Sequence, residues 1–343
     1  MARIVIAGAG AIGASIAYHL AARGAEEVVL ADRAHVAAGA TGKAMGGVRQ
    51  QFSTAAEVRL ARESIGFFHE LGASFFQPVG YIFLATTEDG LARLEERAEL
   101  QRGLGVPVER VDPSRIEGLR VDDVLGAVVC WEDGVADPTA VTRELVRRAG
   151  VEVREGTDAR DLDCDVLVIA AGASSIELWP ELPVRPLCRQ LVDLGPVAGL
   201  PEDMPMVLEA ETGFHFRRAG DALRLAMSEP TARWTDREDV DEALVEDWRA
   251  RIAHRYPPAA DARVARAWAG LYDMTPDSHP IIGWVGEGVY AACGFSGHGF
   301  MQSPAVGKAV AEELVDGKSS FDLGPYRLER FDAGVVFPEE IVL

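Results

Sequence analysis

The first 32 residues contain the feature that most constrains how this chain can fold. An apolar run leads directly into Gly8-x-Gly10-x-x-Gly13, and a second apolar run ends in Asp32, 19 positions after the last glycine. Gly8 allows a tight turn, Gly10 lets a pyrophosphate approach the backbone, and Gly13 lets a helix pack closely on a strand. The N-terminus of that helix offers N–H groups to phosphates, and Asp32 is placed to accept hydrogen bonds from ribose hydroxyls. The sequence therefore predicts a dinucleotide site.

Composition narrows the class of protein further. The 343 residues include 34 Lys and Arg against 54 acids, a net charge of −20 that argues against nucleic acid or anionic membranes as partners. Apolar runs such as residues 166–171 are too short to span a bilayer. The cysteines show neither a C-x-x-C pair nor metal-ligand spacing: Cys130, Cys164, Cys188 and Cys293. We expect reduced thiols, no metal and a cytoplasmic location.

Periodicity and capping signals outline the remaining elements. Helices are expected over about 54–71, 91–103 and 239–256, and another after Asp137-Pro138. Strands are expected at 80–85 and 166–172, and the alternating segments 214–217 and 222–226 predict antiparallel strands with one wet face. Ser303-Pro304 is typical of a cap and first turn, which predicts a last helix beginning there and ending near Gly317.

Two C-terminal segments carry a resemblance to a known family. They are similar to motifs of the D-amino-acid-oxidase-like FAD-dependent oxidoreductases. The segments are Gly270-Leu-Tyr-Asp-Met-Thr-Pro-Asp-Ser-His-Pro-Ile-Ile-Gly283 and Gly294-Phe-Ser-Gly-His-Gly-Phe300. Within them, the chain most resembles the branch of sarcosine oxidase, dimethylglycine dehydrogenase and the L-proline dehydrogenase β-subunit. The resemblance implies an α/β fold: a Rossmann-type FAD-binding domain with a discontinuous substrate domain built on an antiparallel sheet. It assigns residues 1–76, 134–187 and 268–343 to the FAD-binding domain, and 77–133 and 188–267 to the substrate-binding domain.

The same resemblance implies which residues contact FAD. They come from the glycine turn and its acid, the 39–49 loop, the ends of later strands and the C-terminal motifs: Gly8, Gly10, Ala11, Ile12, Gly13, Asp32, Arg33, Thr41, Gly42, Ala44, Met45, Gly46, Ala159, Ala171, Gly172, Gly270, Gly294, Gly297, His298, Gly299, Phe300 and Met301. If the last helix begins under the flavin, its positive end stabilises negative charge that develops there during reduction.

Departures from the family patterns are equally informative. Glycine-oxidase-type members have a carboxylate-binding Arg where this chain has Tyr272. Monomeric sarcosine oxidases attach FAD to a Cys at the position of Gly270, so FAD is expected to be non-covalent here. Those oxidases also have a Lys where this chain has Met301, and a second, oxygen-activating Lys aligns loosely with Arg224. The family hairpin is shortened to residues 158–165.

Three residues are the candidates for substrate chemistry. Arg49 follows Gly46-Gly47 in a loop that the family folds along the flavin, where a guanidinium could pair bidentately with a carboxylate. His215 lies on an expected strand facing the substrate cavity, and Tyr272 borders that cavity. His279 is expected to shape the loop that carries Pro280.

These observations favour FAD-dependent oxidation of a small amino acid, an N-substituted glycine or proline, by hydride transfer to flavin N5. Two alternatives stay open: a 2-hydroxy acid dehydrogenase on the same fold, and a flavin-carrying subunit of a hetero-oligomeric dehydrogenase. The C-terminal motif argues against an NAD enzyme. The expected partner is a small amino acid or secondary amine, and assembly into a homo- or hetero-oligomer is left open.

Overall fold

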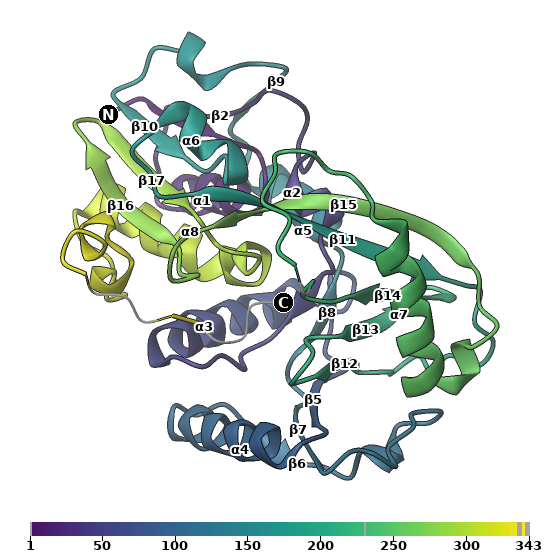
Figure 1. Ribbon diagram of the computed structural model, residues 1–343. Helices are drawn as coiled ribbons and strands as arrows, with labels where there is room; N and C mark the ends of the chain where they lie inside the picture. Colours follow the sequence, from purple (N-terminus) through teal and green to yellow (C-terminus); the bar gives the residue numbers. More distant parts are fainter. Residues whose placement is uncertain (1, 230, 335–337, 340–343) are drawn as a thin grey trace.

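The first of three sheets carries the glycine turn. The computed structural model describes residues 2–229, 231–334, 338 and 339 (Figure 1). Its six-stranded sheet has, in spatial order, β16 (Ile281–Gly286), β17 (Val289–Cys293), β10 (Val166–Ile169), β1 (Ile4–Ala7), β2 (Val28–Asp32) and β9 (Glu152–Glu155). All neighbours pair in parallel except β16 and β17. This is the parallel βαβ arrangement that the N-terminal motif predicts.

Small residues bring three helices onto this sheet. α1 (Ala11–Ala22) packs against α5 (Pro138–Ala149) and α8 (Gly299–Asp316). A Cβ on Gly307 of α8 would lie 2.2 Å from Ser15 Oγ of α1, so only glycine permits this approach. Because β1 is buried along its whole length, it is uniformly apolar, as strands covered on both faces are. The close packing fixes the N-termini of α1 and α8 relative to the sheet.

The second sheet has eight strands and mixed pairing. They are, in order, β15 (Val264–Met274), β11 (Arg185–Leu194), β14 (Ala222–Ala226), β13 (His215–Ala219), β12 (Met206–Glu209), β5 (Tyr81–Ala85), β7 (Gly126–Cys130) and β6 (Glu109–Arg110). Neighbours are antiparallel apart from β12 and β5, which pair in parallel. The expected antiparallel pair is present as β13 and β14.

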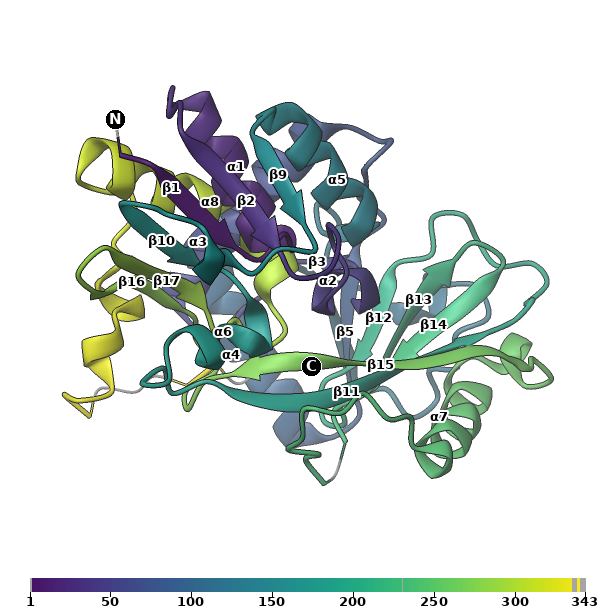
Figure 2. The same cartoon turned by 90° about the horizontal axis from the view of Figure 1, so that it is seen from above.

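Two long strands connect the sheets. β11 and β15 pair from Arg185–Met274 to Leu194–Val264 at one edge of the second sheet, and they extend from the side of β17 to the side of α7 (Figure 2). α7 (Glu242–Arg255) packs on that second sheet through a core that includes Trp248 and Phe216. The division into the two expected domains stays a prediction, but this pair lies where segments of both meet.

The remaining elements surround the space between the sheets. A small sheet contains β3 (Gly47–Val48), β8 (Gly134–Ala136) and β4 (Phe76–Gln77), and the other helices are α2 (Ala40–Lys43), α3 (Ala55–Leu71), α4 (Glu88–Gly103) and α6 (Ser175–Leu178). α4 lies against β5 and β7 at the end of the molecule opposite β9 (Figure 1). Short 3-10 turns follow as η1 (Pro113–Arg115), η2 (Ala159–Asp161), η3 (Gly172–Ser174), η4 (Pro257–Ala259), η5 (Gly324–Tyr326) and η6 (Leu328–Arg330).

Capping explains where the helices begin. The Thr54 hydroxyl accepts from Glu57 N at the start of α3, and Asp137 accepts from Thr139 N and Ala140 N at the start of α5. α4 begins at Glu88, three residues earlier than expected, because Thr87 caps it. α7 is shorter than expected, because the side chain of Asp241 caps it.

One expected boundary is wrong. Ser303 and Pro304 lie inside α8, which begins at Gly299 and ends before Gly317. Pro304 has no N–H to donate to the Phe300 carbonyl, and the Ser303 hydroxyl donates to that carbonyl instead, at 2.9 Å. The helix therefore tolerates proline in its second turn. Among the described residues, no helix is long and apolar enough to cross a membrane.

Candidate active site

A cavity lies between the glycine turn and the second sheet. Its wall contains most of the residues expected to contact FAD or substrate: Gly8, Gly10, Ala11, Ile12, Asp32, Thr41, Ala44, Met45, Gly46, Arg49, Ala171, Gly172, His215, Gly270, Tyr272, Gly297, His298, Gly299, Phe300 and Met301. These residues come from segments far apart in the sequence, and the fold brings them to one space. The N-terminus of α8 also opens onto this cavity, because His298, Gly299 and Phe300 line it.

The glycine turn has no room for side chains. Gly8 has a φ of +109°, and a Cβ there would lie 2.4 Å from the Ala170 carbonyl oxygen. A Cβ on Gly13 would lie 1.9 Å from the Gly8 oxygen, so Gly13 serves helix packing, as the motif predicts. The Asp32 carboxylate accepts from Ala9 N at 2.8 Å and Ala34 N at 2.7 Å, one bond to each oxygen. Each oxygen keeps a lone pair for a ribose hydroxyl.

Five predicted residues do not line the cavity. Gly13 and Gly42 pack against backbone carbonyls, and Arg33 is on the surface in an ion pair with Glu177, at 2.6 Å. Ala159 is buried below the sheet among Val5 and its neighbours. Gly294 N donates to Asp273 Oδ2 at 2.7 Å, and a Cβ there would lie 2.4 Å from Thr275 Cγ2. Gly13, Gly42 and Gly294 therefore serve close packing of the backbone, and Arg33 and Ala159 lie away from the cavity.

Arg49 is held rigidly in the cavity wall. The residue is buried, its Nη1 donates to the Gln51 carbonyl, and its Cζ lies 4.0 Å from the centre of the Phe52 ring. Residues 50 and 51 are fixed in turn by the fully buried Asp133 carboxylate, which accepts from Gln50 N at 3.0 Å and Gln51 Nε2 at 3.1 Å. A guanidinium fixed in this way loses little conformational entropy when it binds a carboxylate.

His215 and Tyr272 face the same cavity in uncharged forms. Burial lowers the pKa of His215 to about 4, and the charges of Arg49 and Arg189 act in the same direction. A hydrogen bond to the Gly213 carbonyl partly offsets this lowering. Because Nδ1 donates to that carbonyl at 2.8 Å, Nε2 of the neutral ring is an acceptor. Burial raises the pKa of Tyr272, so its hydroxyl stays protonated. Its ring packs so closely on Gly297 that a Cβ there would lie 2.3 Å from Cε2.

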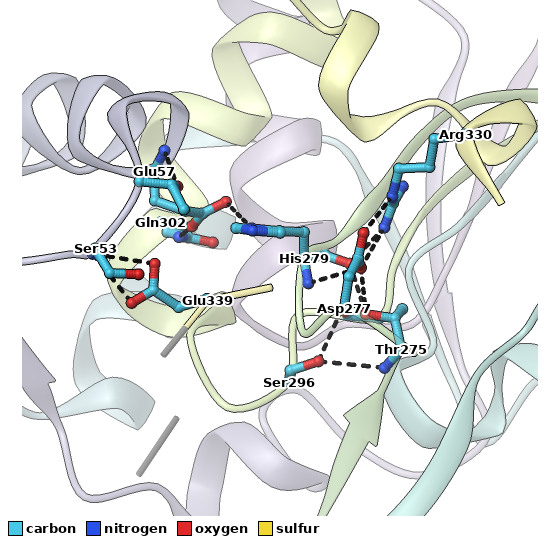
Figure 3. Close-up of polar contacts among 11 residues, drawn as sticks. Ser53, Glu57, Thr275, Asp277, His279, Ser296, Gln302, Arg330 and Glu339 are labelled. Carbon is cyan, nitrogen blue, oxygen red and sulfur yellow. Dashed lines mark hydrogen bonds and ion pairs between the residues drawn. The ribbon is translucent and has the colours of Figure 1, made fainter. Parts of the chain in front are cut away.

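A buried polar network holds the first C-terminal motif against α3 and η6, and Thr275 N donates to Ser296 Oγ of the second motif (Figure 3). The Glu57 carboxylate of α3 accepts from His279 Nδ1 at 2.8 Å and from Gln302 Nε2 of α8. Arg330 donates to Asp277 through Nε at 2.8 Å and through Nη2 at 2.9 Å, and Nη2 also reaches the His279 carbonyl. His279 is absent from the cavity wall and shapes the loop, as expected.

The cations expected near the flavin differ from those of the oxidases. Met301 lines the cavity as a neutral side chain. Arg224 does not line it: its guanidinium makes two hydrogen bonds to Asp193 on the neighbouring strand, at 2.8 and 2.9 Å. The loose alignment of Arg224 with an oxygen-activating lysine is therefore wrong, because its charge is neutralised outside the cavity.

Sequence reasoning missed several residues on the wall. Arg189 of β11 and Tyr81 of β5 line the cavity, and an ion pair between Lys43 and Glu238 joins two of its lining segments. Arg189 lies in an alternating strand, where a charged residue ordinarily marks the wet face. Only the pairing of β11 with β15 shows that this side of the strand faces the cavity.

The parallel sheet, the glycine turn and the cavity define a protein of the dinucleotide-binding class, with a second sheet on the other side of the cavity. The model of the family described as FAD dependent oxidoreductase matches residues 3–313, and the chain belongs to this family. FAD-dependent oxidoreductase domain-containing protein 1 of Xenopus laevis is 27% identical, covering 96% of this chain and 82% of that protein. 4-Methylaminobutanoate oxidase of Paenarthrobacter nicotinovorans is 24% identical over 96% of this chain, which spans 45% of that longer protein.

The solved structures agree with this assignment. L-Proline dehydrogenase from P. horikoshii superposes with a TM-score of 0.90 at 26% identity, covering 98% of this chain and 99% of that one. The expected family, the α/β fold and the dependence on FAD are thereby confirmed, and the protein is an FAD-dependent oxidoreductase.

Proposed function

We propose that the protein oxidises a small amino acid, an N-substituted glycine or proline, at the carbon beside the nitrogen. The observation that carries this proposal is the buried Arg49 guanidinium, fixed on the cavity wall close to the neutral His215. Two similar proteins, L-proline dehydrogenase and 4-methylaminobutanoate oxidase, are named for acids that contain a secondary amine. When bound, FAD supplies the acceptor, flavin N5, for the hydride that leaves this carbon.

The residues that fit FAD are those that leave space or offer donors. Gly8 and Gly10 let a pyrophosphate approach the backbone, the N-terminus of α1 offers N–H groups to it, and Asp32 keeps acceptors for the ribose. The N-terminus of α8 opens onto the cavity, although α8 begins at Gly299 rather than at Ser303, and its positive end would stabilise negative charge on a bound flavin. Gly270 has no side chain to which FAD could be attached.

The substrate would be oriented by charge at one end and by neutral acceptors at the other. Arg49 binds the carboxylate through its planar fork, and its stacking on Phe52 keeps that fork in place. Nε2 of His215 can accept a hydrogen bond from the amine, since this ring nitrogen carries no proton. Tyr272 contributes a protonated hydroxyl and an apolar ring that excludes water. The imine product is then hydrolysed by water.

An anaerobic screen of amino acids and 2-hydroxy acids tests this proposal. The FAD-loaded protein is mixed with each compound without oxygen, and bleaching of the flavin absorption is followed. We expect bleaching by secondary amino acids such as sarcosine or L-proline. Bleaching by 2-hydroxy acids alone would contradict the proposal and favour the hydroxy acid dehydrogenase.

A further inference from the structure

Arg189 is a second arginine on the wall of the active-site cavity, and its charge has no assigned use. It lies on β11 directly opposite Gly270 of β15, in the strand pair that crosses between the sheets. Its side chain is 12% exposed. Its Nε and Nη1 are buried and have no hydrogen-bond partner among the residues that the structure describes. Buried donors of a charged group are costly when they stay unpaired.

Glu229 forms an ion pair with Arg189, but it shares its carboxylate with a second arginine. Glu229 is held by Arg233, whose Nη2 lies 2.7 Å and whose Nε lies 3.3 Å from its oxygens. Arg189 Nη1 is 3.5 Å from Glu229 Oε2, which is an ion pair without a hydrogen bond. One carboxylate therefore faces two guanidinium groups, and one positive charge is left in excess.

Two further side chains on the cavity wall near Arg189, those of Tyr272 and His215, are neutral. Its Cζ lies 5.9 Å from the centre of the Tyr272 ring, and the Tyr272 hydroxyl stays protonated. His215 is uncharged at neutral pH, and its low pKa reflects burial first and then the charges of both Arg49 and Arg189. The two arginines thus act on the same histidine across one cavity. The other acids on the cavity wall are engaged elsewhere. Glu238 is paired with Lys43, Asp32 accepts from Ala9 N and Ala34 N, and Asp273 accepts from Gly294 N.

We propose that Arg189 forms a second anion subsite, so that the preferred substrate is an amino acid with a second carboxylate, of the N-carboxyalkyl amino acid class. The proposal rests on the proposed function, in which Arg49 binds the first carboxylate. A guanidinium fork with unpaired N–H groups matches a carboxylate in charge and geometry. A monocarboxylic substrate would leave these donors unpaired, and sites of this kind discriminate strongly against ligands that lack the partner.

The binding of redox-inert acids tests the subsite without turnover. Succinate and glutarate are compared with butyrate and valerate by titrating the FAD-loaded protein and following the shift of the flavin spectrum. We expect the diacids to bind about 10- to 100-fold more tightly than the matched monoacids, as one charge-assisted pair implies. Arg189→Gln should abolish this preference while leaving monoacid affinity within about threefold. Arg224→Gln, whose charge is paired with Asp193 outside the cavity, is the matched control and should keep the preference.

Two results would overturn the subsite. One is equal affinity of the wild-type protein for diacids and monoacids. If Arg189→Gln does not hold FAD, this wild-type comparison decides the question by itself. The other is an equal loss of affinity for both acids in Arg189→Gln, which would indicate a structural role only.

Parallel anaerobic bleaching with sarcosine and iminodiacetate separates this proposal from the proposed function. In one outcome, sarcosine bleaches the flavin, iminodiacetate is not preferred, and the inert diacids bind no more tightly than the monoacids. This outcome rejects the subsite and leaves amine oxidation intact. Absence of bleaching by either amine, with an Arg189-dependent preference for diacids, rejects amine oxidation and supports the subsite.

Discussion

Replacing Asp133 should change how the stability of the protein depends on pH. This carboxylate is fully buried and accepts three hydrogen bonds from residues 50 and 51, which follow Arg49. Burial, partly offset by these bonds, raises its pKa from 3.8 to about 6. An acid with a raised pKa in the folded state stabilises most below its unfolded pKa, and this contribution is lost as the pH rises through the folded pKa. For Asp133 the loss falls between about pH 4 and pH 7.

The size of this effect follows from the two pKa values. At about 1.4 kcal/mol per pH unit, the rise from 3.8 to about 6 corresponds to about 3 kcal/mol. Urea unfolding of the wild type and Asp133→Asn, with saturating FAD, measures it at several pH values. The difference in unfolding free energy between the two proteins should shift by most of this amount from pH 4 to pH 8, with the wild type losing stability relative to the variant.

Asp236→Asn, at an exposed position, is the matched control and should show a much smaller shift. The reasoning would be refuted if Asp133→Asn and wild type had parallel pH profiles. Such a result would mean that the carboxylate is solvated or that its hydrogen bonds fully offset burial. Because Gln51 also accepts from Arg49, the KM for a carboxylate substrate is expected to rise in Asp133→Asn as well.

Cofactor attachment, oxygen reactivity and helix packing give three further predictions. Because Gly270 offers no attachment atom, acid precipitation should leave the yellow colour in the supernatant; a yellow pellet would disprove this. Met301 is neutral, so we expect the substrate-reduced flavin to reoxidise slowly in air. In stopped-flow measurements, this reoxidation should be slower than steady-state turnover with artificial acceptors. Met301→Lys should accelerate it. In urea unfolding, Gly307→Ala should lower the free energy of unfolding by about 2 kcal/mol, because the added Cβ clashes with Ser15. Gly66 lies at an open position in α3, so Gly66→Ala should raise the free energy of unfolding by up to about 1 kcal/mol. Equal effects of Gly307→Ala and Gly66→Ala would contradict the close packing of α8 on α1.

Local signals made much of the fold predictable. The glycine turn, the acid at its second strand and the caps of α3 and α5 depend on neighbouring residues, so the sequence contains them directly. The start of α8 was not predictable in this way. Ser303 and Pro304 have the chemistry of a helix start, but the Ser303 hydroxyl compensates the carbonyl that proline leaves without a partner.

The site was predictable mainly where a motif marked it, His215 on an alternating strand being the exception. Arg49 and Tyr272 lie next to glycine-rich motifs, whereas Arg189 lies in an ordinary strand and Asp133 in a turn. Their roles depend on long-range contacts, from β11 to β15 and from Asp133 to the loop after Arg49. The cytoplasmic location, the domain boundaries and the oligomeric state stay predictions.

The most direct test of the central claim is the anaerobic reductive half-reaction of the wild type and Arg49→Ala with the amino acid that bleaches the flavin best. Losing a charge-assisted pair in a shielded site costs about 2–4 kcal/mol, so the substrate concentration for half-maximal bleaching rate should rise by about 30- to several-hundred-fold. The flavin spectrum and FAD content should be nearly unchanged. Unchanged half-saturation in Arg49→Ala would remove this residue from the site and contradict the proposed orientation of the substrate.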